Sequence, residues 1–339
     1  MQLNPVKETR LGPIDVVACA STLGHLLRFV KGEGLQFRML VEVIGSTVHL
    51  IRRENSPHET IPDIRGYGHR FPETYTTWDA DVRGSASHQR ILGYQFAGLG
   101  CLVRFKGDGY LPDKAGSIPE KQGENSTTSL ETVTAKLATT GVAPVAPKRG
   151  AGSLPLQINP GGRVIPQEAV FDLKTRSVKS DPDIVMATEL PRWWLAQIPN
   201  FILARHQFGR FNDIEVKDIR KDVEIWESTN ADTLSRFASL LHRIVGVARG
   251  RKDGKMEILR EADQPILKIL EQLPEVPAAF SVQVARRWKS WLSGTGNLAS
   301  GVDHEHEGEA TDSDEDWVEF EGDFTFCSEE CEYCGRCAR

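Results

Sequence analysis

Residues 167–175 read QEAVFDLKT, and this stretch decides how the rest of the chain is interpreted. Its apolar, β-branched and aromatic content predicts a strand. Side chains two positions apart share one face of a strand, so Glu168, Asp172 and Lys174 are expected to point the same way. A carboxylate binds a hard divalent cation, and a neighbouring lysine can orient an attacking water. The stretch therefore predicts part of a hydrolytic metal site.

A second carboxylate is needed for such a site, and residues 100–110 (GCLVRFKGDGY) supply one. These residues predict another strand, and Asp108 lies near its end. Gly107 and Gly109 flank it and would allow a close approach of backbone or ligand. If the two strands pair, Asp108 and Asp172 can share one Mg²⁺ or Mn²⁺ ion. The alternative is that the D-x-K pattern is an exposed, salt-bridged pair with no catalytic role.

The surrounding sequence predicts helices and strands in alternation. Helical spacing is expected over residues 21–31, 218–248 and 278–292, and a helix over 190–206 that breaks at Pro199 and continues as a strand. Residues 36–44 and 47–53 predict a hairpin, and residues 91–96 pair with 100–110. Together these elements predict an α/β domain with a mixed, mostly antiparallel central sheet flanked by helices.

Composition divides the chain further. Residues 112–162 are rich in Ser, Thr, Gly, Pro and Ala and nearly free of aromatic residues, which predicts a disordered insertion. The insertion separates an N-terminal half of the domain (1–111) from a C-terminal half (163–292). An acidic linker (293–326) and a cysteine-rich tail (327–339) follow.

Charge is distributed unevenly along the chain. Residues 303–339 hold fourteen Asp and Glu against two Arg, a balance of −12, so the remainder carries 39 basic and 33 acidic residues, or +6. A basic body can attract a polyanion, and an acidic tail can compete for the same surface or simply aid solubility. No apolar run is long enough to span a membrane, and the N-terminus lacks secretory features. We therefore expect no membrane association and a cytoplasmic or nuclear location.

Four cysteines cluster at the C-terminus: Cys327, Cys331, Cys334 and Cys337. Thiolates this close together suit Zn²⁺ or, less well, an iron–sulfur cluster. His304 or His306 can replace one thiolate. The alternatives are a reduced tail without metal, or a redox-active pair at Cys334 and Cys337. A metal-bound tail would be an element on which a protein partner can dock.

Basic and aromatic residues interleave over 286–291 (RRWKSW). This pattern is found in nucleic-acid contacts. On a helix, however, Trp288 and Trp291 share one face, which favours a stripe that docks on the core.

Four motifs carry a resemblance to known proteins: GYGHRFPETYTT, SHQRILGYQFAGLGCLVRFKGDGYL, VFDLKTRS and PRWWLAQIPNFILARH. In this order they resemble a family of uncharacterised fungal proteins, often labelled geranylgeranyl pyrophosphate synthetase, over roughly residues 60–250. The chain contains no DDxxD motif, which a prenyl synthase needs to bind diphosphate, so the sequence does not support that label. More distantly, the motif order is similar to the Rai1/DXO decapping exoribonuclease group of PD-(D/E)xK enzymes.

The second resemblance implies a restriction-endonuclease-like core and metal-dependent cleavage of RNA or DNA. It implies that Asp108 and Asp172 hold the metal, that Lys174 assists the attacking water, and that Gln197 orients the substrate phosphate. Glu168 or Glu73 would serve as a further ligand.

One position departs from the family pattern. Lys106 stands where the resemblance implies a glutamate, and it removes a possible metal ligand. Two functions therefore stay open: a divalent-metal-dependent nuclease, or a catalytically inactive nuclease-fold protein with an interaction or regulatory role.

The cysteine tail gives a first testable prediction. We expect the purified protein to carry about one zinc ion, measured by mass spectrometry of the metal content, and to lose it on changing Cys331 and Cys334 to Ser. The loss is expected because the double change removes two of the four thiolate ligands of a tetrahedral site. Metal content that is unchanged in the double variant, or absent from the wild-type protein, contradicts the prediction.

Overall fold

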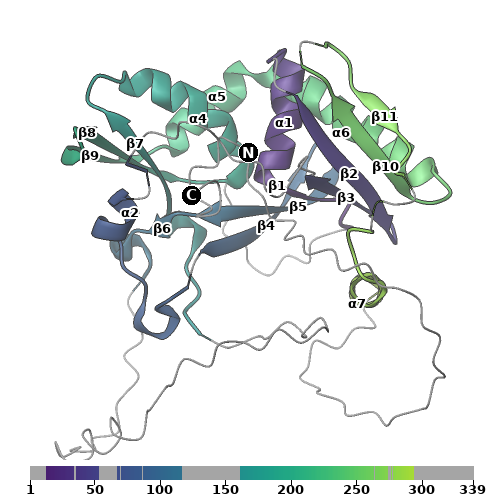
Figure 1. Cartoon of the computed structure of the whole chain (residues 1–339), viewed down its shortest axis with the longest axis horizontal. Coiled ribbons are helices and arrows are strands. Elements are labelled where there is room, and N and C mark those ends of the chain that lie inside the picture. The colour runs from purple at the N-terminus through teal and green to yellow at the C-terminus, as the bar shows by residue number, and fades with distance from the viewer. Residues whose placement is uncertain are drawn as a thin grey trace, which may run out of the picture.

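The fold is described by a computed structural model, which covers residues 13–33, 36–52, 67–68, 70–85, 87–116, 161–262, 264–273, 276 and 278–293. Within these residues the strands form two sheets, one of seven strands and one of four (Figure 1). The chain passes from the larger sheet to the smaller one directly after β5 (Leu99–Gly107). The expected α/β architecture, a mixed sheet flanked by helices, is therefore confirmed, and a second, smaller sheet adds to it.

The seven-stranded sheet is parallel at its centre and antiparallel at both sides. Strand β1 (Val16–Cys19) runs parallel to both β3 (Thr47–Arg52) and β5. The outer strands pair antiparallel, in the order β11 (Lys268–Leu270), β10 (Lys255–Arg260) and β2 (Phe37–Ile44) beside β3, and β4 (His88–Phe96) beside β5. Its buried face consists of alternate side chains, as the strand period of two requires.

The four-stranded sheet has the order β6-β7-β8-β9. Strand β6 (Gly109–Tyr110) pairs antiparallel with β7 (Val170–Ser177), which runs parallel to β8 (Asn200–Gln207). Strand β9 (Arg210–Asp218) returns antiparallel to β8. Because β7 and β8 are parallel neighbours, a crossover must join them, and helix α4 (Pro182–Ala196) is that crossover.

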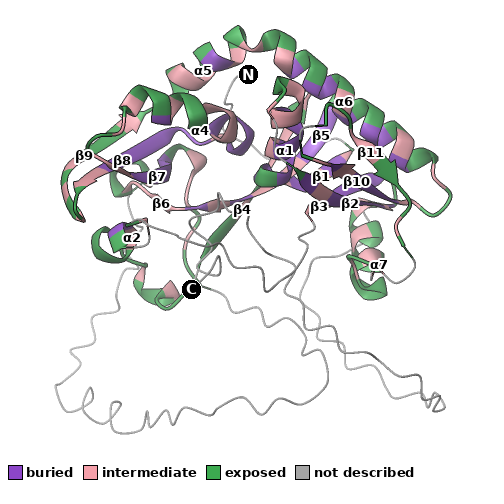
Figure 2. Ribbon diagram, turned by 45° about the horizontal axis from the view of Figure 1, so that its top comes forward, coloured by how far each residue is buried: buried purple, intermediate pink, exposed green. Residues whose placement is uncertain are grey.

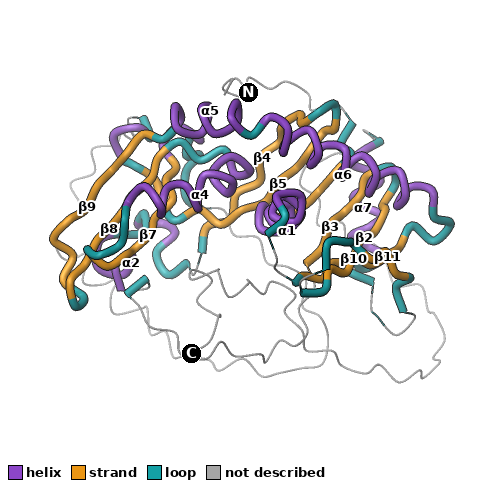
Figure 3. The backbone as a smooth tube through the Cα atoms, turned by 90° about the horizontal axis from the view of Figure 1, so that it is seen from above, coloured by secondary structure: helices purple, strands orange, loops and turns teal. Residues whose placement is uncertain are grey.

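One hydrophobic core joins both sheets through the helices. Helices α1 (Ala20–Lys31), α4, α5 (Arg220–Thr229) and α6 (Ala231–Gly250) contribute buried side chains to the same cluster as β1–β3, β5 and β8. Figures 2 and 3 show α5 and α6 running one after the other along the outside of the molecule. A smaller core lies on the other face of the four-stranded sheet, under helix α2 (Arg70–Tyr75).

Helix α4 has clear signals at both ends. The side chain of Asp181 accepts a hydrogen bond from the Asp183 backbone N–H, and Pro182 stands in the first turn, where its missing N–H costs nothing. The helix ends at Gln197, which adopts a left-handed conformation with φ of 51°. These ends fix which residues of α4 lie against β7.

Several sequence-based expectations are confirmed. The helix at 21–31, the hairpin at 36–53 and the strand after Pro199 correspond to α1, β2–β3 and β8. The single helix expected over 218–248 is wrong, because α5 ends at Thr229 and α6 begins at Ala231. Strands β1, β9, β10 and β11 were not expected. Of the predicted insertion, residues 112–116 and 161–162 are described, and 117–160 lie outside the described residues.

Helix α7 (Val282–Leu292) packs on the face of the seven-stranded sheet opposite α1. The ring of Trp288 meets His49 of β3 edge-on at 5.2 Å, and Phe280 meets it at 4.8 Å. Trp291 lies 5.1 Å from Trp288. Trp288 therefore packs on the sheet as the docking interpretation predicts, whereas Trp291 stays exposed. No helix in the described part of the chain has the length and apolarity to cross a bilayer.

Two buried histidines predict an acid-sensitive fold. Burial lowers the pKa of His49 from 6.5 to about 4 and, with nearby Arg28, that of His25 to about 3. The unfolded chain therefore binds protons on both rings below about pH 6.5, while the folded chain does not until about pH 4. The free energy of unfolding should be undiminished above pH 6.5 and fall by roughly 1.4 kcal/mol per pH unit for each histidine below it.

Urea unfolding between pH 4.5 and 7.5 measures this slope. His49→Phe keeps an aromatic ring in the same place, and it should remove about one histidine's share of the slope while leaving stability near pH 7.5 unchanged. An identical pH slope in the variant would show that His49 does not titrate in this way.

Candidate functional site

The candidate site lies where the chain crosses between the two sheets. Strand β5 ends at Gly107, Asp108 follows, and Gly109 begins β6 opposite Phe171 of β7. The Asp108 carboxylate accepts a hydrogen bond from the backbone N–H of Leu173 at 2.9 Å. This contact holds Asp108 against β7, so the pairing expected from the sequence is present.

The two faces of β7 have different roles. Phe171 and Leu173 join the small core with Phe71 of α2. Asp172 and Lys174 alternate with them and face helix α4, where they are only 2% and 5% exposed. A charged pair this deeply buried needs partners, because an uncompensated charge in the interior is costly.

Helix α4 supplies those partners. Arg192 and Trp193 follow Glu189 by three and four positions, so each is a neighbour of Glu189 on the helix surface. Trp193 donates its indole N–H to Asp172 at 2.7 Å, and Arg192 forms an ion pair with the same carboxylate. Glu189 bridges the two cations, at 3.1 Å from Lys174 and 3.0 Å from Arg192.

Asp108 and Asp172 share a hydrogen bond and differ in their affinity for protons. Burial and the negative charge of Asp172 raise the pKa of Asp108 well above its usual value. Burial alone would also raise the pKa of Asp172, but Arg192 and Lys174 outweigh it and hold that pKa below its usual value. Of the two carboxyl groups, Asp108 therefore has the higher affinity for a proton.

The two carboxyl groups are suitable ligands for a divalent cation, but within the part of the chain that the structure describes the site lacks further protein ligands. Two neighbouring carboxyl groups, one of which has a raised pKa, are a ligand pair that Mg²⁺ can use while keeping several waters. Among the described residues, however, no three or more His, Cys, Asp or Glu side chains gather as a metal-binding group. Any cation here would depend on two carboxylates.

The further ligands expected from the sequence lie elsewhere. Glu168 was expected on the strand beside Asp172, but it lies in a short 3-10 turn (Gln167–Ala169) before β7 and is exposed. Glu73 is exposed on α2, which packs through Phe71 on the opposite face of β7. Among the described residues, the structure therefore does not bring either glutamate together with the carboxylate pair.

Gln197 is placed at the end of α4. Its side-chain amide donates to the carbonyl oxygen of Trp194 at 2.6 Å, so it turns back on the last helical turn. Lys106 of β5 pairs with Gln89, and its side chain points away from the core residues Val103 and Phe105. The structure thus brings together Asp108, Asp172 and Lys174. The cysteine cluster at 327–337 lies outside the described residues.

Sequence reasoning missed Glu189, Arg192 and Trp193. The available signal was their helical spacing: a glutamate and an arginine three apart, inside an apolar helix that follows directly after the D-x-K strand. A charged residue such as Glu189 among the buried, mostly apolar residues of a helix indicates a charged partner in the interior.

The fold is shared with a known class of proteins. The chain is similar to Rai1 of Scheffersomyces stipitis, with a TM-score of 0.52, 9% identity and coverage of 83% of this chain and 75% of that one. It is also similar to Candida albicans Rai1 in complex with pU5-Mn2+, with a TM-score of 0.50, 7% identity and coverage of 82% and 72%. At these identities the likeness shows the fold alone.

The family is defined by sequence. Residues 2–278 match the family described as "Domain of unknown function (DUF8563)", and the chain belongs to that family. No curated protein matches the chain. The comparisons give no support for the label of geranylgeranyl pyrophosphate synthetase.

The backbone of Gly109 lies so close to the ring of Phe171 that we expect only glycine to fit at position 109. A Cβ on Gly109 would lie 2.4 Å from the ring of Phe171, whereas one on Gly107 would meet its nearest atom at 3.5 Å. Gly109→Ala should therefore lower the free energy of unfolding by roughly 1–3 kcal/mol through overpacking. Gly107→Ala is the matched control and should cost less than half as much in urea unfolding. Equal losses would mean that Phe171 moves aside without cost.

Proposed function

We propose that this protein is a divalent-metal-dependent hydrolase of nucleic-acid phosphodiesters, with its centre at Asp108, Asp172 and Lys174. The observation that carries the proposal is the buried hydrogen bond between Asp108 and Asp172, with the pKa of Asp108 raised. Two carboxylates held this close together can act as a cation-binding pair. The Rai1 fold and the Mn²⁺ and pU5 in the Candida albicans complex are consistent with this class.

Asp108 and Asp172 would hold Mg²⁺ or Mn²⁺, which supplies a Lewis acid for phosphate oxygens. The pKa of Asp108 is raised by burial and by the charge of Asp172, so cation binding is expected to favour its ionised form. Lys174, on the same strand face as Asp172, would orient the attacking water and offset negative charge at phosphorus. Glu189 accepts from Lys174 at 3.1 Å and fixes where the ammonium group points.

Arg192 has a positioning role in this proposal. It pairs with both Asp172 and Glu189, and its side chain is 38% exposed, so it reaches from the buried carboxylates toward solvent. An arginine in this place can attract a phosphate group and bind it through two donors. The substrate would be RNA or DNA, and the predicted cytoplasmic or nuclear location would supply either.

The second candidate function is a catalytically inactive nuclease-fold protein that binds nucleic acid or another protein. Two observations favour it. Arg192 already neutralises Asp172, and Lys106 occupies the position where the Rai1/DXO resemblance implies a glutamate. In this case the charge cluster is structural, and any partner would bind through other surfaces, including the C-terminal tail.

Cleavage assays distinguish the two functions. Purified protein would be incubated with labelled single- and double-stranded RNA and DNA, with Mg²⁺, Mn²⁺ or a chelator. We expect metal-dependent cleavage of at least one substrate, lost on Asp172→Ala and reduced roughly 10²–10⁴-fold by Lys174→Ala, because each removes a group at the reacting phosphate. Calorimetry with Mn²⁺ should show binding that Asp172→Ala abolishes.

Glu168→Ala is the matched control, since Glu168 is exposed and lies just outside the strand. It should leave cleavage unchanged. Circular dichroism on each variant separates a lost fold from a lost function. Cleavage absent with every substrate and metal, or present and indifferent to both site variants, would rule out the enzyme and leave the inactive binding protein.

A further inference from the structure

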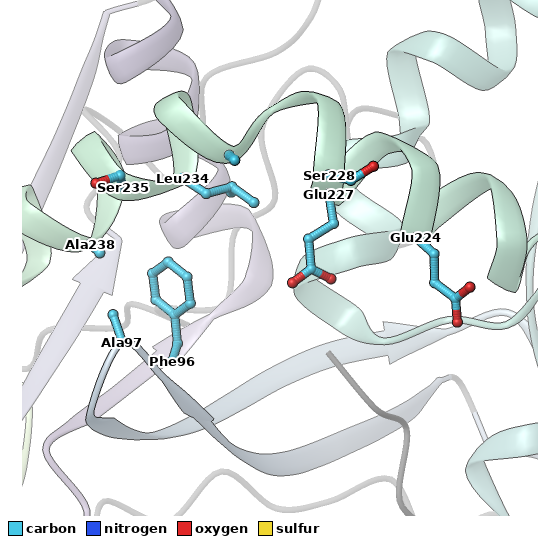
Figure 4. Close-up of a pocket in the computed structure, with 9 residues that line it drawn as sticks. Phe96, Ala97, Glu224, Glu227, Ser228, Leu234, Ser235 and Ala238 are labelled. Carbon is cyan, nitrogen blue, oxygen red and sulfur yellow. The ribbon is translucent and has the colours of Figure 1, made fainter.

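A groove lies between the α5–α6 junction and the turn that joins β4 to β5 (Figure 4). Its volume is about 550 Å³. The apolar part of its lining includes Phe96, Ala97, Leu234 and Ala238, and Glu224 and Glu227 add two carboxylates. An apolar groove with acidic groups at one end suits a chain segment that carries both apolar and basic side chains.

The walls of the groove are held in place by the core. The ring of Phe96 lies 5.3 Å from that of Trp194 and 5.5 Å from that of Phe237. His242 of α6 makes a hydrogen bond of 2.9 Å with the carbonyl oxygen of Ala97. The groove is therefore preformed and does not need a ligand to open it.

A buried donor lies beside the groove. Trp194 lines a small adjoining cavity that shares Glu224 and Glu227 with it. The indole N–H of Trp194 is buried, and within the described residues it has no hydrogen-bond partner. Buried donors of this kind are usually satisfied, so an acceptor from outside the described residues is expected nearby.

The described chain begins next to this groove. Pro13 packs so closely on Gly100 that its carbonyl oxygen lies 2.1 Å from where a Cβ of Gly100 would be. Asp15 exchanges two hydrogen bonds with Gly100, at 2.8 and 2.9 Å, and its carboxylate pairs with Arg249 of α6 at 2.7 Å. Gly100 pairs with Gln95, the neighbour of Phe96. Residues 1–12 therefore join the fold one or two positions from the groove wall.

Residues 1–12 read MQLNPVKETRLG and have the chemistry that the groove requires. Leu3, Val6 and Leu11 are apolar, and Lys7 and Arg10 outnumber the single acid Glu8. Twelve residues in extended form span up to roughly 40 Å, enough to cross the groove. The match to the DUF8563 family begins at residue 2, so this segment is part of the family's domain.

We propose that residues 1–12 dock in this groove as an extended strap. Its apolar side chains cover Phe96 and Leu234, its basic side chains lie toward Glu224 and Glu227, and one of its backbone carbonyls accepts the Trp194 N–H. This intramolecular interface stands apart from the proposed hydrolase centre and holds whether or not that centre cleaves nucleic acid.

Limited proteolysis of the full chain tests the proposal, because trypsin cleaves after Lys7 and Arg10 only when the segment is released. Ser235→Trp fills the groove from an exposed position on α6, and Ser239→Trp, one turn further and outside the groove, is the matched control. With intact mass spectrometry as the readout, Ser235→Trp should speed cleavage at both sites about tenfold or more. Ser239→Trp should cleave at the wild-type rate.

Hydrogen–deuterium exchange gives the reciprocal measurement. The double change Leu3→Asp and Val6→Asp should raise amide exchange over residues 224–238 without lowering the melting temperature of the core. Equal cleavage in wild type and Ser235→Trp, together with unchanged exchange in the double variant, overturns the proposal. Protection of residues 1–12 that rises with protein concentration also overturns it, since a second copy would then be the occupant.

Discussion

The negative charge of Asp172, buried between β7 and α4, is the constraint on which the rest of the structure depends. At 2% exposure this carboxylate has almost no water, so the protein must supply its counter-charges and donors. Arg192 and Trp193 come from α4, and Asp108 comes from the crossing between the sheets. Removing any one partner leaves part of a buried charge uncompensated, which costs several kcal/mol in comparable clusters. The same charge thus fixes the helix against the strand and joins the two sheets.

Local patterns were enough to predict much of the fold. The hairpin followed from two apolar runs and a two-residue link, and β2 and β3 pair with Ile44 opposite Thr47. Strand β1 could not be predicted, because four residues carry too little pattern and its parallel pairing with β3 and β5 is decided at long range. The break at Asn230 was hidden for another reason. Apolar residues continue at helical spacing across it, from Val223 and Trp226 to Leu234, so hydrophobicity alone does not mark the turn.

Strand geometry alone was enough to predict the residues that the β-strands contribute to the candidate site, but not those from helix α4. Asp172 and Lys174 share a face because of the period of two, and Asp108 follows from the pairing of β6 with β7. Glu168 does not share the face of Asp172 because the strand begins at Val170, three residues later than expected, and Glu168 lies in the 3-10 turn before it. Glu189 and Arg192 were missed because their place depends on how α4 is rotated against β7. That rotation is set by tertiary packing, which no single segment of sequence contains.

The sheet crossing also has a kinetic consequence. Asp108 and Leu173 are 65 positions apart in the chain, so their contact can form only after a loop of that size has closed. The entropy of closure grows with the logarithm of loop length, and doubling the loop would cost only about 0.6 kcal/mol. The stability of the carboxylate pair is thus nearly indifferent to how many residues intervene. The rate at which the pair assembles does depend on that number, because contacts of high sequence separation slow folding. The segment between the two strands can gain or lose residues over evolution without disturbing the native centre, at the expense of a slower search for it.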